Sequence, residues 1–206
     1  GDMRTRGVEL GLHTKNIVTD GFSWSTSLTL SAMDQKITRL QNTPNAFDMV
    51  AGRGRGNIVG YPRGSLFSFN FQGLNNGLPT FDFGLYPSSQ GEYSNIAGAD
   101  FLDAQYVKSY LLYHGPIEPQ VIGGLSNTFK YKDWEFSFFI TMQAGNKIRL
   151  NPTFDPEFGD LNVFSKSYYN RWLNPGDEFK TDVPALPSQE LIAKVGKENI
   201  ERAYNT

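Results

Sequence analysis

The sequence lacks cysteine entirely and has few charged residues, at 19% of its 206 positions. Without cysteine, a disulfide-stapled secreted domain and a thiolate zinc site are both excluded. Its 19 Lys and Arg against 21 Asp and Glu leave a net charge of −2, which argues against a protein that binds nucleic acid through a basic face. No stretch approaches the roughly 20 consecutive apolar residues of a membrane-spanning helix.

Aromatic and turn-forming residues are abundant instead. Aromatics make up 14% of the chain, together with 21 Gly and 11 Pro, and this mixture is typical of β-structure joined by ordered loops. The clearest pattern runs from Phe22 to Met33, where apolar and polar residues alternate. A period of two predicts a strand with one apolar and one polar face. The apolar face holds Phe22, Trp24, Thr26, Leu28 and Leu30, and the polar face holds Ser23, Ser25, Ser27, Thr29 and Ser31.

Three further segments alternate in the same way, so we expect four strands at about residues 6–15, 22–33, 124–132 and 134–143. Phe139 is an exception, because it falls on the polar face of the last strand. Each segment is roughly 9–12 residues, the length that a tilted strand needs to cross a bilayer. Short turns join the strands in pairs, whereas residues 34–120 and 146–206 form long loops. This alternation is typical of outer-membrane barrels, although a soluble β-sandwich gives the same side-chain pattern.

Two local structures are predicted within the long loops. Phe67, Phe69 and Phe71 alternate with polar residues and lead into the turn Asn75-Asn76-Gly77, so a β-hairpin is expected there. After Pro187, Ser188 is placed to cap a short helix near the C-terminus. Its apolar positions are Leu191, Ile192, Val195 and Ile200.

No pattern of an enzyme active site stands out. The two histidines, His13 and His114, lie in unrelated segments, and no nucleophile elbow, zinc-protease motif or phosphate-binding loop is present. We therefore expect no catalytic residue, no metal site and no cofactor.

Several short motifs follow one another in an order that resembles the SusC/RagA family of TonB-linked outer-membrane transporters. Each is weak alone, and their order over nearly the whole chain makes the resemblance specific. They are Thr5-Arg6-Gly7-Val8-Glu9-Leu10, Gly60-Tyr61-Pro62 with Phe71-Gln72-Gly73-Leu74, Tyr113-His114-Gly115-Pro116 with Gly123-Gly124, Gly145-Asn146-Lys147, and Tyr169-Asn170-Arg171-Trp172 with Pro175-Gly176-Asp177.

The resemblance implies a mainly β fold: antiparallel strands of a partial transmembrane β-barrel, with long extracellular loops. Residues 1–206 would be a single segment, a C-terminal fragment of a TonB-dependent barrel of about 22 strands in the Gram-negative outer membrane. It also implies import of nutrients such as glycans or peptides. The implied partners are outer-membrane lipid, a SusD-like lipoprotein and TonB, the last through parts of the protein absent here. The alternative is a stand-alone secreted β-sheet protein that binds glycans.

Two sets of residues are candidates for function. In a barrel, Ser23, Ser25, Ser27 and Thr29 would face the lumen. The loop aromatics Tyr93, Tyr168, Tyr169 and Trp172 are candidates for contact with substrate or with the lipoprotein lid. The alternative for each aromatic is that it packs the loops internally.

Overall fold

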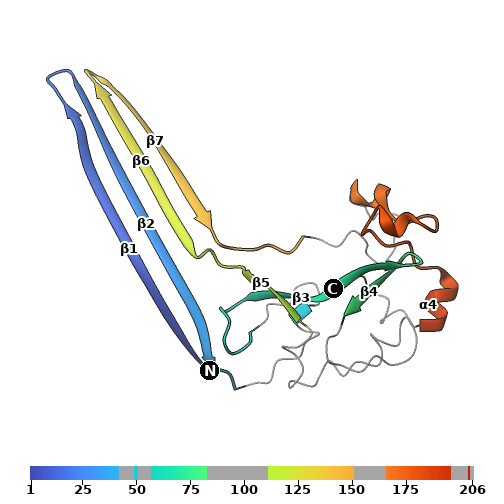
Figure 1. The fold of residues 1–206 in the computed structure, drawn as a ribbon. Coiled ribbons are helices and arrows are strands. Elements are labelled where there is room, and N and C mark those ends of the chain that lie inside the picture. The colour runs from blue at the N-terminus through green and yellow to red at the C-terminus, as the bar shows by residue number, and fades with distance from the viewer. Residues whose placement is uncertain (42–48, 51–56, 83–110, 151–165, 196–203, 205–206) are drawn as a thin grey trace. The chain divides into compact units, whose positions relative to one another are not determined.

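The computed structural model describes residues 1–41, 49–50, 57–82, 111–150, 166–195 and 204 (Figure 1). The chain divides into two compact units. Unit 1 comprises Gly1–Gln41, Asn57–Ser65 and Gly115–Ile148, and unit 2 comprises Asn42–Gly56, Leu66–His114 and Arg149–Thr206. The four-stranded sheet lies in unit 1, and most of the three-stranded sheet lies in unit 2.

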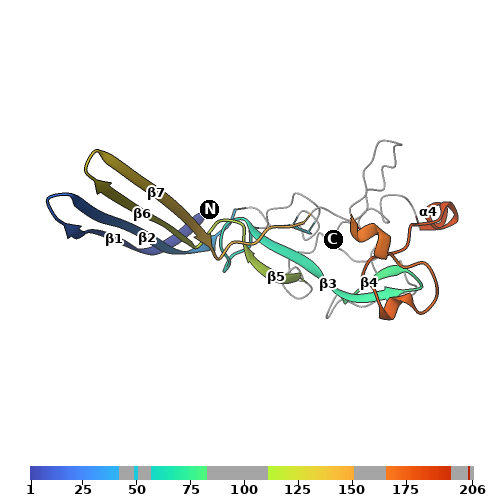
Figure 2. The same ribbon diagram turned by 90° about the horizontal axis from the view of Figure 1, so that it is seen from above.

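Unit 1 contains a four-stranded sheet in the order β1-β2-β6-β7. Its strands are β1 (Asp2–Val18), β2 (Phe22–Arg39), β6 (Val121–Tyr131) and β7 (Trp134–Ala144), and every neighbouring pair is antiparallel. Figures 1 and 2 show the four as long ribbons lying side by side. Short turns join β1 to β2 and β6 to β7 at one end of the sheet, and the long connections leave from the other end.

The four strands predicted from the sequence are present, but β1 and β2 are considerably longer than expected. Their extra residues form rungs with charged side chains, such as Asp2 opposite Arg39 and Arg4 opposite Lys36. Backbone pairing continues there although the apolar alternation has ended, so the sequence pattern marks only the amphipathic part of each strand. Near the turn, β1 has an irregularity between Lys15 and Ile17 that leaves Asn16 as an extra residue.

The register sorts the side chains of this sheet onto two faces. Leu12, Leu28, Leu125 and Ile140 form one rung across all four strands, because residues directly opposite each other in antiparallel strands share a face. The next rung on the other face contains His13, Ser27, Ser126 and Phe139. One face is therefore largely apolar and the other is dominated by hydroxyl groups.

Unit 2 contains a three-stranded sheet in the order β4-β3-β5, made of β3 (Ser65–Asn75), β4 (Leu78–Asp82) and β5 (Leu111–Pro116). The predicted hairpin is confirmed as β3 and β4. Its turn residues Asn76 and Gly77 both have positive φ angles, 48° and 81°, as a tight two-residue hairpin turn requires. Leu66, Phe67 and Phe69 of β3 are buried, so this sheet has an apolar core.

The last described part of the chain forms three short helices: η1 (Lys166–Asn170), η2 (Asp177–Phe179) and α4 (Gln189–Val195). The sequence predicted a helix beginning after Ser188, whose carbonyl accepts a bond of 3.0 Å from the Ile192 amide. Ile200, its last predicted apolar position, lies outside the described residues. In the described part of the chain, no helix combines the length and the apolarity that crossing a membrane would require.

Candidate functional site

The four predicted lumen residues form one column on the polar face of the unit 1 sheet. Ser23, Ser25, Ser27 and Thr29 follow each other at every second position of β2. Along β6 they are opposite Lys130, Thr128, Ser126 and Gly124, and β7 adds Ser137, Phe139 and Thr141. Lys130 forms an ion pair of 2.9 Å with Glu135. The structure thus gathers a wall of small hydroxyl groups, each of which can donate and accept a hydrogen bond.

Phe139, the exception to the sequence pattern, has a structural partner on this face. A Cβ atom added to Gly124 would lie 2.9 Å from Phe139 Cζ and 3.2 Å from Thr29 Oγ1. Real side chains do not approach so closely, so the missing side chain at Gly124 is what leaves room for the ring. Phe139 nevertheless remains 66% exposed.

The opposite face exposes apolar side chains along its whole length. Val8 is 74% exposed, Phe136 64% and Ile140 54%. A soluble domain seldom exposes a contiguous apolar surface of this kind. Aromatic side chains gather on it near the short turns, as an interfacial girdle would. Trp24 and Phe129 stack there with centroids 5.6 Å apart, and Phe129 also contacts Phe136 and Phe138.

A chain of polar side chains interrupts this apolar face beside the aromatic cluster. Asn127 is 7% exposed, and its Oδ1 accepts hydrogen bonds from Trp24 Nε1 at 2.9 Å and from Thr26 Oγ1 at 2.7 Å. Thr26 Oγ1 in turn accepts from Asn16 Nδ2 at 2.6 Å, and Thr14 Oγ1 donates to Asn16 Oδ1 at 2.8 Å. The network spans β1, β2 and β6 across the bulge. The sequence showed no signal for it, because Asn127 sits at an apolar position of the alternation.

The end of the sheet with the long connections carries a loop that is hydrogen-bonded to β2 and to the segment between β5 and β6. The Ile37 amide donates to the Tyr61 carbonyl and the Gly60 amide donates to the Ile37 carbonyl, both at 2.9 Å. On the other side, the Ile117 amide donates to the Gly64 carbonyl at 3.2 Å. These bonds fix residues 57–65 on the rim of unit 1.

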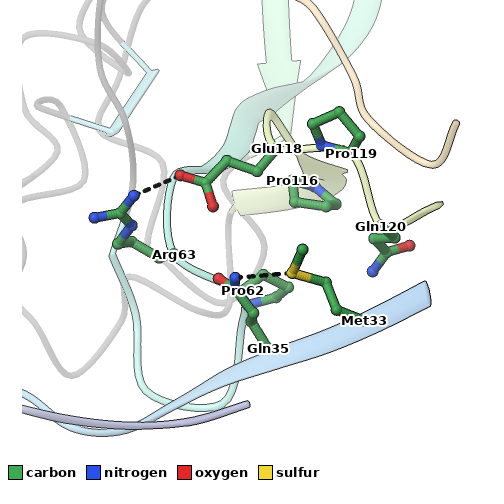
Figure 3. A pocket seen from close by; sticks show the side chains of 8 residues that line it. All are labelled: Met33, Gln35, Pro62, Arg63, Pro116, Glu118, Pro119 and Gln120. Carbon is green, nitrogen blue, oxygen red and sulfur yellow. Dashed lines mark hydrogen bonds and ion pairs between the residues drawn. The ribbon is translucent and has the colours of Figure 1, made fainter. Parts of the chain in front are cut away.

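A small pocket lies beneath this loop (Figure 3). Gln35 Nε2 lies 3.4 Å from Met33 Sδ at one side of it, and Arg63 Nη2 forms an ion pair of 2.6 Å with Glu118 Oε1 at another. Its free interior has room for about one water molecule, so it is too small for a sugar ring or a peptide side chain. We interpret the pocket as a packing gap between the loop and the rim of the sheet, without a binding role. It is lined by Met33, Gln35, Pro62, Arg63, Pro116, Glu118, Pro119 and Gln120.

The candidate loop aromatics differ from one another. In unit 2, the ring of Trp172 lies within 2.6–2.9 Å of where a Cβ on Gly77 would be, so it packs against the hairpin turn. Tyr168 stacks under the Arg171 guanidinium at 4.2 Å. Tyr169 is 82% exposed and is the one of the three that faces solvent. Tyr93 lies outside the described residues. For Trp172 the internal-packing alternative therefore describes the contacts seen.

Two carboxylates organise the loop around Trp172. Backbone hydrogen bonds, first from the Asn174 amide, together with the Lys180 ammonium, lower the pKa of Asp177. The indole N–H of Trp172 donates to Glu178 Oε2 at 2.7 Å and lowers the pKa of Glu178. Both groups are thus held in their charged form by the fold.

Among the described residues, few contacts suggest an enzyme active site or a metal site. Ser68 Oγ and His114 Nε2 lie 2.7 Å apart in unit 2, as an exposed hydrogen-bonded pair. No group of three or more metal-ligating side chains occurs in the part of the chain that the structure describes.

No protein-family model matches the chain, but curated relatives do. TonB-dependent receptor P26 of Formosa agariphila is 28% identical over 158 residues, which are 72% of this chain and 15% of that receptor. TonB-dependent receptor P3 of the same organism is 21% identical over 228 aligned residues, which cover all of this chain and 22% of the receptor. The chain thus spans about a fifth or less of the length of these relatives. Both are named as receptors.

Solved structures agree on the fold. The RagAB peptide transporter matches 90% of this chain and 20% of its own, with a TM-score of 0.60 and 19% identity. The RagAB peptide importer in its "open-open" state matches 90% and 19%, with a TM-score of 0.55 and 20% identity. The resemblance of this chain to the SusC/RagA-type TonB-dependent outer-membrane transporters, expected from its sequence, is thereby confirmed.

Proposed function

We propose that the chain forms part of the barrel wall of an outer-membrane TonB-dependent transporter that imports nutrients such as glycans or peptides. The observation that carries the proposal is the two-faced sheet of unit 1, with an exposed apolar face and a hydroxyl-lined face on the same four strands. In a barrel wall, the apolar face meets lipid and the hydroxyl face lines a wet lumen.

The height of the apolar face supports this assignment. Its rungs run from Ala32 to Phe22 on β2, which are ten residue steps apart. At about 3.4 Å per residue and a strand tilt of about 40°, these steps span roughly 26 Å along the membrane normal. The apolar band of outer-membrane barrels is about 25 Å tall. The strand length and the membrane thickness therefore agree.

The connections set the orientation of the proposed wall. The turns at Asp20-Gly21 and Lys132-Asp133 are short, and long segments leave the opposite end of the sheet. In outer-membrane barrels short turns are periplasmic and long loops are extracellular. The loop stretches, with exposed Tyr169, would then face the outside. Residues 1–206 would form a single segment of the barrel domain.

The partners follow from the same proposal. The named RagAB structures concern a peptide transporter, which favours import of a polymeric nutrient and a second protein that works with the barrel. We propose a SusD-like lipoprotein as that second protein. TonB would act through parts of the transporter outside this chain. Substrate would be captured between loops and lipoprotein and then pass along Ser23, Ser25, Ser27 and Thr29.

A secreted glycan-binding β-protein is the second candidate. It is favoured by the aromatic cluster of Trp24, Phe129, Phe136 and Phe138, which could serve as a sugar platform on an exposed sheet. The two functions differ in what contacts the apolar face, which is lipid in the first and water in the second.

Substitution by arginine at two adjacent positions separates them. Leu28 lies in the middle of the apolar face, opposite Leu12 and Leu125, whereas Ser27 lies on the polar face. In the protein at its native length, folded into lipid vesicles, Leu28→Arg should cost roughly 2–4 kcal/mol of folding free energy. Ser27→Arg is the matched control and should insert normally.

Urea unfolding in vesicles and resistance of the folded form to detergent on gels would measure both variants. Insertion of Leu28→Arg with undiminished stability would refute the transporter wall. A loss confined to Ser27→Arg would show that the two faces are assigned the wrong way round.

A further inference from the structure

Phe139 is the only aromatic residue on the polar face of the unit 1 sheet, among the residues that the structure describes. We propose that its ring forms a stacking subsite for neutral sugar rings on the lumen wall, with the surrounding hydroxyl groups as hydrogen-bonding partners. This inference rests on the proposed function, since it takes the polar face to line the lumen. It narrows the substrate class from glycans or peptides to glycans.

The position of the ring is built into the backbone. Its far edge, Cζ and Cε2, lies over Gly124, where an added Cβ would come within 2.9 and 3.0 Å of these atoms. Aromatic rings are known to shield strand glycines from a neighbouring strand. Shielding accounts for where the ring lies, and it leaves the outer side of the ring free, since the residue is 66% exposed.

The neighbours of the ring are small and polar. Ser126 and Ser27 share its rung, and Thr29 and Thr141 stand in the adjacent rung on either side of Gly124. Each hydroxyl can both donate and accept a hydrogen bond. A flat ligand that stacks on the ring would therefore lie next to these hydroxyl groups.

The charges near the ring do not select an ionic ligand. On the polar face of β6 and β7, the charged residues are Lys130 and Glu135, which form an ion pair with each other at 2.9 Å. Glu135 lies four residues from Phe139 along β7, and Lys130 is opposite Glu135 on β6. At the other end of the rung is His13 of β1. The residues that adjoin Phe139 on β6 and β7 are therefore uncharged, whereas Lys15 lies across the sheet on β1, in the next rung of the same face.

These features match the surface of a sugar ring better than that of a peptide. A pyranose has an apolar C–H face, which packs on an aromatic ring, and a rim of hydroxyl groups that both donate and accept hydrogen bonds. An extended peptide gains affinity from a free strand edge and from pockets for alternate side chains. Both edges of β6, which carries Gly124 and Ser126, are paired with β2 and β7, and in the proposed barrel the outer edge of β7 would pair with the next strand, so no strand edge would be open to a peptide here.

Oligosaccharide binding to the protein at its native length, folded in detergent micelles, tests the proposal. The probes are maltohexaose, cellohexaose and xylohexaose, with penta-alanine as the peptide probe, and the readouts are titration calorimetry and saturation-transfer NMR. We expect at least one hexasaccharide to bind. Phe139→Leu should weaken that binding about five- to tenfold, because it keeps an apolar side chain but removes the ring face.

Two matched variants control for folding. Phe139→Trp keeps a stacking surface and should retain the affinity. Phe136→Leu removes an exposed ring from the same strand on the opposite face and should leave sugar binding unchanged. The proposal is overturned if no hexasaccharide binds, if Phe139→Leu binds as well as the parent, or if penta-alanine binds in a Phe139-dependent manner.

Failure of this inference is distinguishable from failure of the proposed function. The chain contains no cysteine, so Ser25→Cys and Leu28→Cys each introduce one thiol into it. In vesicles, a water-soluble maleimide should label Ser25→Cys and spare Leu28→Cys. That labelling result without sugar binding would overturn only the Phe139 subsite. The reverse labelling pattern would overturn the lumen wall, and the subsite with it.

Discussion

The two sheets of this protein differ in how far they bury their apolar side chains. The three-stranded sheet buries Leu66, Phe67 and Phe69 of β3. On the four-stranded sheet every residue of β7 is exposed, and the apolar face is exposed on the two edge strands and half-buried on β2 and β6. Burial of apolar surface is the main stabilising term in a water-soluble domain. The first sheet obtains that stabilisation from its own unit, whereas the described residues leave much of one apolar face of the second sheet uncovered.

This difference in burial indicates the surroundings that each sheet needs in order to be stable. Two unpaired edges, β1 and β7, flank the four-stranded sheet in this chain, and open edges invite pairing with further strands. In the proposed barrel wall, further strands would pair with these edges and a bilayer would surround the apolar face. We expect the two regions to answer differently to substitutions of similar size, and the following experiments exploit that difference.

The largest effect is expected in the core of unit 2. Phe67 is 2% exposed and its ring lies 5.6 Å from that of Tyr113. Phe67→Ala should cost about 3–5 kcal/mol, because it removes a buried ring and leaves a cavity. Phe179→Ala, in the same unit but 89% exposed, should stay within about 0.5 kcal/mol.

Urea unfolding combined with hydrogen exchange of the β3 and β5 amides would measure both variants. Accelerated exchange confined to these strands is expected for Phe67→Ala. Equal behaviour of the two variants would show that unit 2 has no core of its own, and the contrast between the two sheets would be lost.

The next effect concerns the hairpin turn that Trp172 covers. Gly77→Ala should cost about 2–4 kcal/mol, because φ is 81° and the new Cβ would meet the indole ring at 2.6 Å. Gly73 has a φ of 107° with nothing within 4 Å of an added Cβ. Gly73→Ala therefore carries the conformational cost alone, about 1–2 kcal/mol.

The difference between these two variants isolates the contacts of the Gly77 turn with Trp172 and Ala185. It can be read from thermal unfolding followed by near-ultraviolet circular dichroism. Equal losses would mean that the loop around Trp172 does not rest on the hairpin.

A smaller effect is expected at the polar network on the apolar face of the other sheet. Asn127→Leu keeps the volume but removes the acceptor for Trp24 Nε1 and Thr26 Oγ1. Leaving these donors without an acceptor should cost about 1–3 kcal/mol, and the indole N–H of Trp24 should exchange faster with solvent by NMR. Ser126→Ala, the neighbouring residue on the polar face, serves as the control.

A stabilising Asn127→Leu would be equally informative. It would show that lipid-facing surface at this depth favours an apolar side chain over the hydrogen-bonded network. The hydrogen-bonded network would then help to fix the register of the strands without raising the free energy of unfolding.

The sequence predicted what depends on local periodicity. Alternation marked the four strands of unit 1, and Asn75-Asn76-Gly77 marked the β3–β4 hairpin, because a tight turn with positive φ needs these residue types. β5 was not predicted, since Leu111-Leu112-Tyr113-His114 does not alternate and its pairing is set by β3 alone. Long-range partners such as Asn127 with Trp24, over a hundred positions apart, leave no local pattern.

The candidate site was predictable to a similar extent. The column from Ser23 to Thr29 was identified from β2 alone, because side chains at every second position share a face. The contact between Phe139 and Gly124 was not, because it depends on the register between β6 and β7. Trp172 was selected as a loop aromatic, and only the fold shows that its ring contacts the Gly77 turn.

The smallest expected effect is a difference in how the two regions respond to low pH. The pKa values of Asp177 and Glu178 are lowered in the folded state, so their stabilisation is complete above their ordinary values near 4 and is lost as pH falls through the folded values. Below about pH 4 we expect the Trp172 loop to loosen while the four-stranded sheet, whose faces are apolar or hydroxyl-lined, keeps its structure. The indole N–H resonance of Trp172 should shift and broaden as its bond to Glu178 is lost, whereas that of Trp24, bonded to neutral Asn127, should not. Glu178→Gln should make the Trp172 resonance nearly independent of pH, and a Trp24 resonance that titrates alongside it would contradict the separation.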